Sequence, residues 1–119
     1  MREFKRSERV GDMIHHEVSN ILLFEINDPR VEMITVTGIK VSDDLRHANI
    51  YYSLIGDKKR WDDAKEGLSS SKGYIKRQLA KRLEMRYIPD VHFHEDRTME
   101  KGERIDTILH KLDHSKNDG

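Results

Sequence analysis

Cysteine is absent from this chain of 119 residues, and its absence excludes three kinds of chemistry. A chain without cysteine has no disulfide framework, no thiolate zinc site and no cysteine nucleophile. Long apolar runs are also missing, and none approaches the length of a membrane span. The charged start, Met1 to Arg6, is not followed by the apolar core of a signal peptide. We therefore expect a cytoplasmic protein that makes no contact with a membrane.

Net charge is absent as well, because 22 lysines and arginines balance 22 aspartates and glutamates. Such a chain does not bind polyanions by bulk charge, so any contact with nucleic acid must come from a local patch. The sequence also has no nucleophile motif and no glycine-rich phosphate loop. We expect no small-molecule substrate and no cofactor. The length suits one domain with one modest core, and we expect it to act as a monomer.

The first clear helical pattern covers residues 7–26, where apolar side chains fall on one face. Ser7 is the expected N-cap, and Glu8 supplies an acid in the first turn. Asn27 to Pro29 combine turn formers with a proline that restricts the residue before it. The helix is therefore expected to end near Ile26.

Two runs rich in β-branched and alternating residues follow, and they predict an antiparallel hairpin. The first run covers residues 33–42, in which Gly38 indicates a bulge or a point of close packing. The second covers residues 48–54, and the sequence from Ser42 to Leu45 has the chemistry of a turn.

Residues 58–86 predict two helices separated by a break. The first has a buried face of Trp61, Ala64 and Leu68. Gly73 and the three serines before Lys72 are poor or mediocre helix formers, and Gly/Ser pairs are a recognised cause of sharp kinks. The second helix carries an apolar stripe of Ile75, Leu79 and Leu83.

The rest of the chain predicts a third strand over residues 90–95, with Val91 and Phe93 pointing inward. Residues 99–113 are expected to form a C-terminal helical extension, and residues 114–119 a disordered tail. The predicted order is α-β-β-α-kink-α-β. This is an α+β fold in which the helices cover one face of a three-stranded sheet, within a domain of residues 1–98.

The second half of the kinked helix concentrates positive charge, with six basic residues and one acid between Lys72 and Arg86. Its start is expected to expose unpaired N–H groups that could bind phosphate beside Lys72 and Lys76. Arg77 and Lys81 lie one turn apart, opposite the apolar stripe, where they could meet successive phosphates. Tyr74 is expected on their side as a stacking surface.

Some basic residues in and around this helix have two interpretations. Arg82 and Arg86 could contact RNA, or they could lie beside the core and complement the negative end of the helix. Arg30 could hold its loop through an ion pair or touch RNA. Arg6 and Arg9 belong to a basic N-terminal group that acids dilute, so they are secondary candidates for RNA contact.

The histidines raise a metal hypothesis. His92, His94 and Asp96 alternate along the third strand, so their side chains are expected on one face, where two imidazoles and a carboxylate can ligate zinc. A solvent-exposed strand face explains the same alternation. We favour the exposed face and expect no metal, because no fourth group or supporting shell can be argued.

Several separated motifs, in a fixed order from Arg6 to Leu109, resemble the ribosome-binding factor A family, whose domain is of the bacterial (type II) KH-like kind. The motifs are Arg9-Val10 with Glu17, Ile21 and Leu22 of the first helix, Asp28-Pro29-Arg30, Ile34 to Thr37, Val41 to Ala48, Tyr51 to Ser53, Gly73 to Leu79, Leu83 to Pro89, Phe93 to Asp96 and Gly102 to Ile105. The resemblance implies a non-enzymatic assembly factor. Such a factor binds the immature 30S ribosomal subunit and its 16S rRNA, and it assists late maturation and processing of the 5′ end of that RNA.

The usual Gly-x-x-Gly loop of a KH domain, which clamps a short run of nucleotides, is absent. At its place the chain has Ser71-Lys72-Gly73, where the family more often begins with alanine. The RNA-binding residues that we predict are Ser71, Lys72, Gly73, Tyr74, Lys76, Arg77 and Lys81, with Arg6, Arg9 and Arg30 in second place. The alternative is a protein-interaction module that uses its charged helices and makes no RNA contact.

Overall fold

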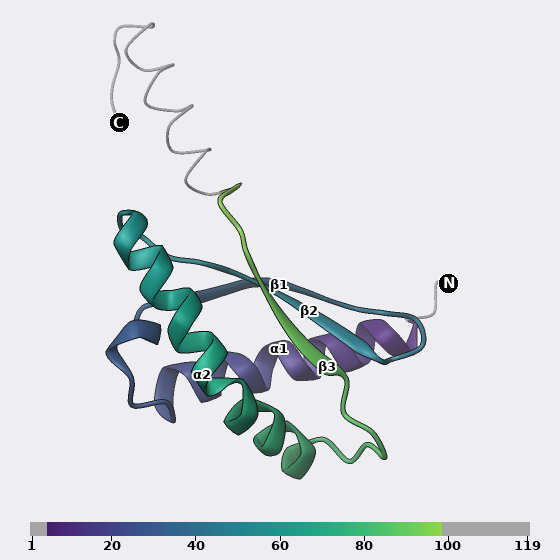
Figure 1. Cartoon of the computed structure of the whole chain (residues 1–119). Coiled ribbons are helices and arrows are strands. Elements are labelled where there is room, and N and C mark those ends of the chain that lie inside the picture. The colour runs from purple at the N-terminus through teal and green to yellow at the C-terminus, as the bar shows by residue number, and fades with distance from the viewer. Residues whose placement is uncertain (1–4, 99–119) are drawn as a thin grey trace, which may run out of the picture.

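The computed structural model describes residues 5–98. Figure 1 shows their arrangement: two long helices lie on the same side of a small sheet. The elements in chain order are α1 (Arg6–Phe24), the short 3₁₀ helix η1 (Pro29–Val31), β1 (Thr35–Val41), β2 (His47–Ser53), α2 (Lys58–Arg82) and β3 (Asp90–Glu95). This confirms the predicted α+β class with a three-stranded sheet. The predicted helix over residues 99–113 and the tail over residues 114–119 lie outside the described residues.

The start of α1 differs from the prediction in its cap. Lys5, not Ser7, is the N-cap, and its backbone N–H donates to Glu8 Oε1 at 3.2 Å. Ser7 lies inside the helix, where it is buried and its hydroxyl donates to Asp43 Oδ1 at 3.5 Å. The N-cap therefore lies two residues earlier than predicted, and Ser7 contacts the β1–β2 turn from within the helix.

The sheet has the order β1-β2-β3, with β1 antiparallel and β3 parallel to β2. The predicted hairpin is confirmed, and so is the irregularity at Gly38, because the register between β1 and β2 shifts between Val36 and Gly38. A parallel β2–β3 pair requires a crossover connection, and α2 supplies it. As a result α2 crosses one face of the sheet and β3 is an edge strand.

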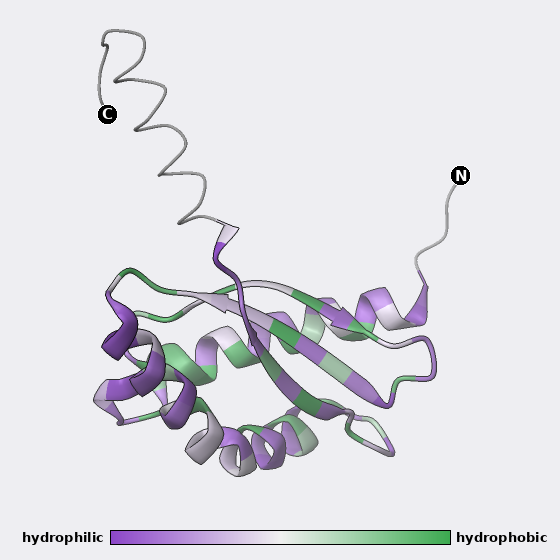
Figure 2. Ribbon diagram, turned by 45° about the horizontal axis from the view of Figure 1, so that its top comes forward, coloured by the Kyte–Doolittle hydropathy of each residue, from purple (hydrophilic) through white to green (hydrophobic). Residues whose placement is uncertain are grey.

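The predicted break in the second helix is wrong: α2 is one continuous α-helix of 25 residues that runs through Ser71, Lys72 and Gly73. Its buried residues recur on one face through that stretch, and they include Leu68, Ser71 and Ile75. Fully burying one large apolar side chain contributes about 1.5–3 kcal/mol, whereas one glycine costs a helix about 1 kcal/mol. Packing against the sheet therefore outweighs the weak local propensity. The helix does change direction along its length (Figure 1, Figure 2).

One hydrophobic core lies between the helices and the inner face of the sheet. It takes its side chains from every element, and its largest fully buried members are Trp61, Tyr52, Ile14, Ile21 and Ile50. Hydrophobic and hydrophilic residues alternate along β2 and β3, as Figure 2 shows. The outer face of the sheet is therefore polar and open among the described residues. No helix in residues 5–98 is long and apolar enough to cross a membrane.

Candidate nucleic-acid interface

The exposed and half-buried side chains predicted for RNA contact lie on two different sides of α2. Lys72 and Lys76 face β3, because Lys72 lines a groove beside that strand and Lys76 pairs with Asp90 at its start. Tyr74 packs against the core and reaches α1. Arg77 and Lys81 are exposed, and neither has an ion-pair partner in the described part of the chain. The predicted set is therefore not one surface.

Tyr74 is half-buried and takes part in a contact between α1 and α2. Its hydroxyl donates to Glu25 Oε1 at 2.9 Å, and Arg82 donates to the same carboxylate at 2.6 Å. Arg82 also reaches Glu17 at 3.3 Å. The hydrogen bonds from Arg82 and then Tyr74 lower the pKa of Glu25. Arg82 is therefore held beside α1, and Tyr74 lies three residues before Arg77 on neighbouring turns of the helix with its hydroxyl already bound to Glu25.

The backbone at Ser71-Lys72-Gly73 offers no exposed helix start. The three residues lie within α2, so their N–H groups belong to the interior of the helix, and Ser71 is buried. The predicted phosphate binding through free amides at this point is therefore wrong, because a continuous helix has orphan N–H groups only in its first turn. Any contact here must come from the side chains, chiefly Lys72.

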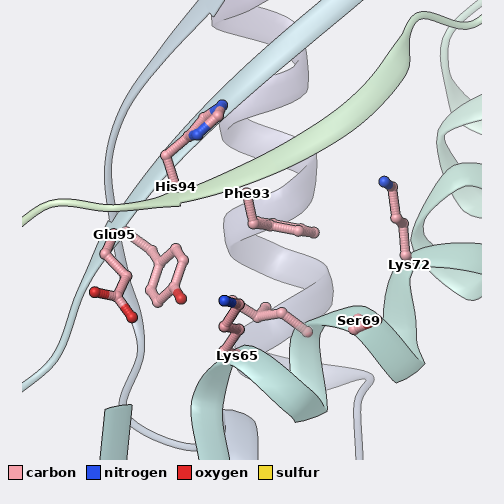
Figure 3. Close-up of a pocket in the computed structure, with 8 residues that line it drawn as sticks. Lys65, Ser69, Lys72, Phe93, His94 and Glu95 are labelled. Carbon is pink, nitrogen blue, oxygen red and sulfur yellow. The ribbon is translucent and has the colours of Figure 1, made fainter. Parts of the chain in front are cut away.

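A groove of about 530 Å³ runs between α2 and β3, and we call it the α2–β3 groove. Figure 3 shows Lys65, Ser69 and Lys72 on α2 opposite Phe93 and Glu95 of β3. Tyr52, Leu68 and His94 complete the lining. The groove thus combines two ammonium groups with a half-buried aromatic ring, which packs edge-on against Tyr52 with ring centroids 6.3 Å apart.

Within residues 5–98, the two lysines that line the groove form no ion pair, whereas the glutamate that lines it does. Neither Lys65 nor Lys72 has an ion-pair partner among residues 5–98. Glu95, by contrast, accepts from Arg97 Nη2 at 3.2 Å. At the far end, Lys76 Nζ lies 2.6 Å from Asp90 Oδ1, and this contact lowers the pKa of Asp90. The groove therefore presents Lys65 and Lys72 to an anionic ligand.

The sequence interpretation missed Lys65, Ser69 and Phe93 as candidates. Lys65, Ser69, Lys72 and Lys76 follow one another at spacings of four, three and four, which is a helical stripe beside the apolar one. The sequence alone contains the signal for that stripe. The sequence contains no signal that Phe93 lies opposite this stripe. That position depends on the pairing of β3 with β2, which makes β3 an edge strand.

The secondary candidates for RNA contact, Arg6, Arg9 and Arg30, also lie in different surroundings. Arg30 is an ion-pair residue: it donates to both carboxylate oxygens of Asp28, and it reaches Glu66 at 3.0 Å. These hydrogen bonds lower the pKa of Asp28. Arg9 is exposed without an ion-pair partner in the described range, and Arg6 lines a different hollow at the start of α1.

The three residues of the metal hypothesis each have a separate protein partner. His92 lies 3.1 Å from His47, His94 lies 2.8 Å from Asn49, and Asp96 accepts from Thr37 at 2.6 Å. Within residues 5–98 no group of three or more histidines and carboxylates is placed to hold a metal ion. The strand face is therefore occupied by hydrogen bonds between side chains.

The fold and the groove together define a class: a small α+β protein whose long crossover helix and edge strand enclose a basic, aromatic groove. Comparison with known proteins identifies the family. The family model described as ribosome-binding factor A matches residues 6–109. The chain belongs to the ribosome-binding factor A family.

Relatives and solved structures agree with this assignment. The chain is 43% identical to ribosome-binding factor A of Syntrophus aciditrophicus over 120 residues, which cover 100% of this chain and 98% of that protein. It is similar to the solution structure of a putative ribosome-binding factor A from Thermotoga maritima, with a TM-score of 0.70, 26% identity and coverage of 84% and 95%. A Thermus thermophilus ribosome-binding factor A, fitted into the map of a 30S complex, has a TM-score of 0.63, 22% identity and coverage of 74% and 92%.

Proposed function

We propose that this protein binds the immature 30S subunit through its 16S rRNA. It then assists late maturation and 5′-end processing of that RNA in the cytoplasm, as a binding factor without catalysis. Family membership supports the ribosomal partner, and the Thermus thermophilus neighbour is described as part of a 30S complex. The observation that carries the RNA contact is the α2–β3 groove, with the unpaired ammonium groups of Lys65 and Lys72 beside Phe93.

The groove suits a single strand of RNA better than a duplex. Two ammonium groups on one helix face can meet phosphates, and a partly exposed aromatic ring can stack on a base only where that base is unpaired. Arg77 and Lys81 lie on the outer side of the same helix, so in this proposal they contact a neighbouring phosphate and not the strand in the groove. Lys76 is a weaker candidate for RNA contact, because a phosphate would have to replace Asp90 as its ion-pair partner.

Co-sedimentation with isolated 30S subunits, compared with assembled ribosomes at two salt concentrations, tests the function. Binding should weaken steeply with salt, since each phosphate neutralised contributes about −0.7 to −0.9 to the log–log slope. We expect stronger binding to the immature or isolated subunit than to assembled ribosomes. A flat salt dependence would contradict RNA contact and favour a protein-interaction module.

A charge-reversal pair locates the interface. Lys65→Glu/Lys72→Glu should reduce 30S affinity at least about tenfold, because charged hydrogen bonds contribute about 1.5–3 kcal/mol each. The matched control is Lys40→Glu/Lys59→Glu, which makes the same charge change at exposed positions outside the groove. Arg77→Glu/Lys81→Glu measures the outer face of α2. Equal affinity for the groove variant and its control would exclude the groove.

A further inference from the structure

A second basic hollow of about 960 Å³ lies at the end of the molecule where α1 begins. In Figure 1 the start of α1, the β1–β2 turn and the loop into β3 all lie toward the right-hand side. Three arginines from these three segments line the hollow, namely Arg6, Arg46 and Arg86. Tyr87 lines it too. We call this site the arginine pocket.

The arginines of this pocket have no carboxylate partner. Among residues 5–98, no acid lies within ion-pair distance of Arg6, Arg46 or Arg86, whereas Arg30 and Arg82 elsewhere in the molecule are paired. The hollow is lined by three arginines and two aspartates, so its lining carries a net positive charge that attracts an anion. Guanidinium groups also match phosphate geometrically, because they donate two parallel hydrogen bonds.

Two carboxylates line the same hollow, and each is already engaged. Asp44 Oδ1 accepts from the Ser42 hydroxyl at 2.7 Å and from the Arg46 backbone N–H at 3.0 Å. Asp90 Oδ1 accepts from Lys76 Nζ at 2.6 Å. Asp44 therefore shapes the turn that presents Arg46, and Asp90 is neutralised from the groove side.

The loop between α2 and β3 holds an aromatic ring outward. Met85 and Ile88 pack against the core and Pro89 is fully buried, so these residues anchor the loop. Tyr87, between them, is 74% exposed, and the Arg86 guanidinium lies 5.5 Å from the centre of its ring. An exposed tyrosine beside an arginine, on an anchored loop, is suited to stack on an unpaired nucleobase.

The two ends of β3 contribute to the arginine pocket and to the α2–β3 groove. β3 begins at Asp90, which lines the pocket, and ends at Glu95, which lines the groove. Six residues of strand span about 20 Å. A single strand of RNA that leaves the groove along β3 therefore meets the pocket next.

We propose that the arginine pocket is a second RNA-binding site for an unpaired segment, in which Arg6, Arg46 and Arg86 bind phosphates and Tyr87 stacks on a base. The proposal rests on the proposed function, because the RNA strand that binds in the groove is the strand that continues into this pocket. The pocket selects single-stranded over double-stranded RNA, since the bases of a duplex offer no free face to Tyr87.

The test measures the affinity of the full chain for a labelled single-stranded RNA of twelve nucleotides and for a labelled RNA duplex, each across a range of salt. Arg6→Gln/Arg86→Gln should weaken single-strand binding at least about tenfold. The same variant should lower the salt slope by about 1.4, or 0.7 for each phosphate that the protein no longer neutralises. Tyr87→Ala should weaken single-strand binding about fivefold or more with an unchanged salt slope and unchanged duplex binding. Tyr87→Phe should retain the affinity.

The controls separate this inference from the proposed function. Lys40→Gln/Lys59→Gln makes the same charge change outside both sites, and thermal unfolding of each variant checks that it folds. If Lys65→Glu/Lys72→Glu loses RNA binding and the pocket variants do not, the pocket inference fails and the proposed function stands. If the pocket variants lose 30S binding but keep RNA binding, the pocket holds a protein and the inference also fails. If no variant affects either ligand, both proposals fail.

Discussion

Gly67 and Gly73 lie six residues apart in α2, and the space beside each is different. A Cβ atom at Gly67 would lie 2.8 Å from Arg30 Cβ and 2.8 Å from Val31 Cγ1. A Cβ atom at Gly73 would meet only the end of the flexible Arg77 side chain, at 3.4 Å. Gly67 therefore permits the close approach of α2 and η1, whereas Gly73 has no such function in the described structure.

We predict opposite effects of alanine at these two glycines. Gly67→Ala should destabilise the protein by about 1–3 kcal/mol, because the added methyl group forces η1 away from α2. Gly73→Ala should stabilise it by about 0.5–1 kcal/mol, because alanine is the better helix former and the site has room. Urea unfolding at pH 7 measures both, and each variant is the control of the other. A stabilising Gly67→Ala would contradict the tight α2–η1 contact.

At the scale of elements, α1 and α2 are joined by a polar contact at the edge of their packed faces. Glu25, just after α1, accepts from Arg82 and Tyr74 of α2, and Glu17 accepts from Arg82 as well. The pKa of Glu25 is lowered by these donors, so its ionised form favours the folded state. The contribution is present above the pKa of an unfolded glutamate and is lost as the pH falls through the lower folded value.

The variant Glu25→Gln should therefore lower the melting temperature by a few degrees at pH 7. The difference from the parent protein should shrink below about pH 4, where the parent carboxylate is protonated too. Because the contact is partly exposed, added salt should also reduce the difference. Thermal unfolding followed by circular dichroism at several pH values is the measurement, with the exposed Glu32→Gln as control. A difference that does not change with pH would assign the effect to the neutral hydrogen bond from Tyr74.

At the scale of the whole molecule, the described residues form a hydrophobic core to which each of their helices and strands contributes. Its members run from Val10 to Val91, and the partly buried residues that pack on it extend to Phe93. The pairing of β2 with β3 extends to Glu95. This supports our proposal that residues 1–98 form the RNA-binding domain and that residues 99–119 extend it.

A chain shortened to residues 1–98 should therefore unfold at the same urea concentration as the full chain. The fluorescence of Trp61, which is buried and is the one tryptophan of the sequence, reports the transition. As a control for sensitivity, Leu79→Ala should cost about 2–5 kcal/mol in both chains. A clearly lower midpoint of the shortened chain would place residues 99–119 against the core and move the domain boundary.

Periodicity in the sequence was enough to predict the helices and strands and most of the core residues. The alternation around Ile50 and the bulge at Gly38 predicted the hairpin, and the spacing of Ile75 and Leu79 predicted a buried helix face. These patterns succeed because burial recurs with the local period of a strand or helix. The predicted break at Gly73 is wrong because it rested on local helix propensity. That propensity is small compared with the packing of α2 against the sheet.

The basic character of the second half of α2, its apolar stripe and the family that the motifs resemble all follow from the sequence. What each polar face of α2 meets depends on the tertiary structure. It turned Tyr74 and Arg82 to α1, paired Lys76 with Asp90, and left Lys65 and Lys72 unpaired beside Phe93. A helical pattern states which side chains share a face, but the neighbour of that face comes from residues 14 to 65 positions away in the chain. The basic helix is therefore one wall of a groove, and β3 supplies the other.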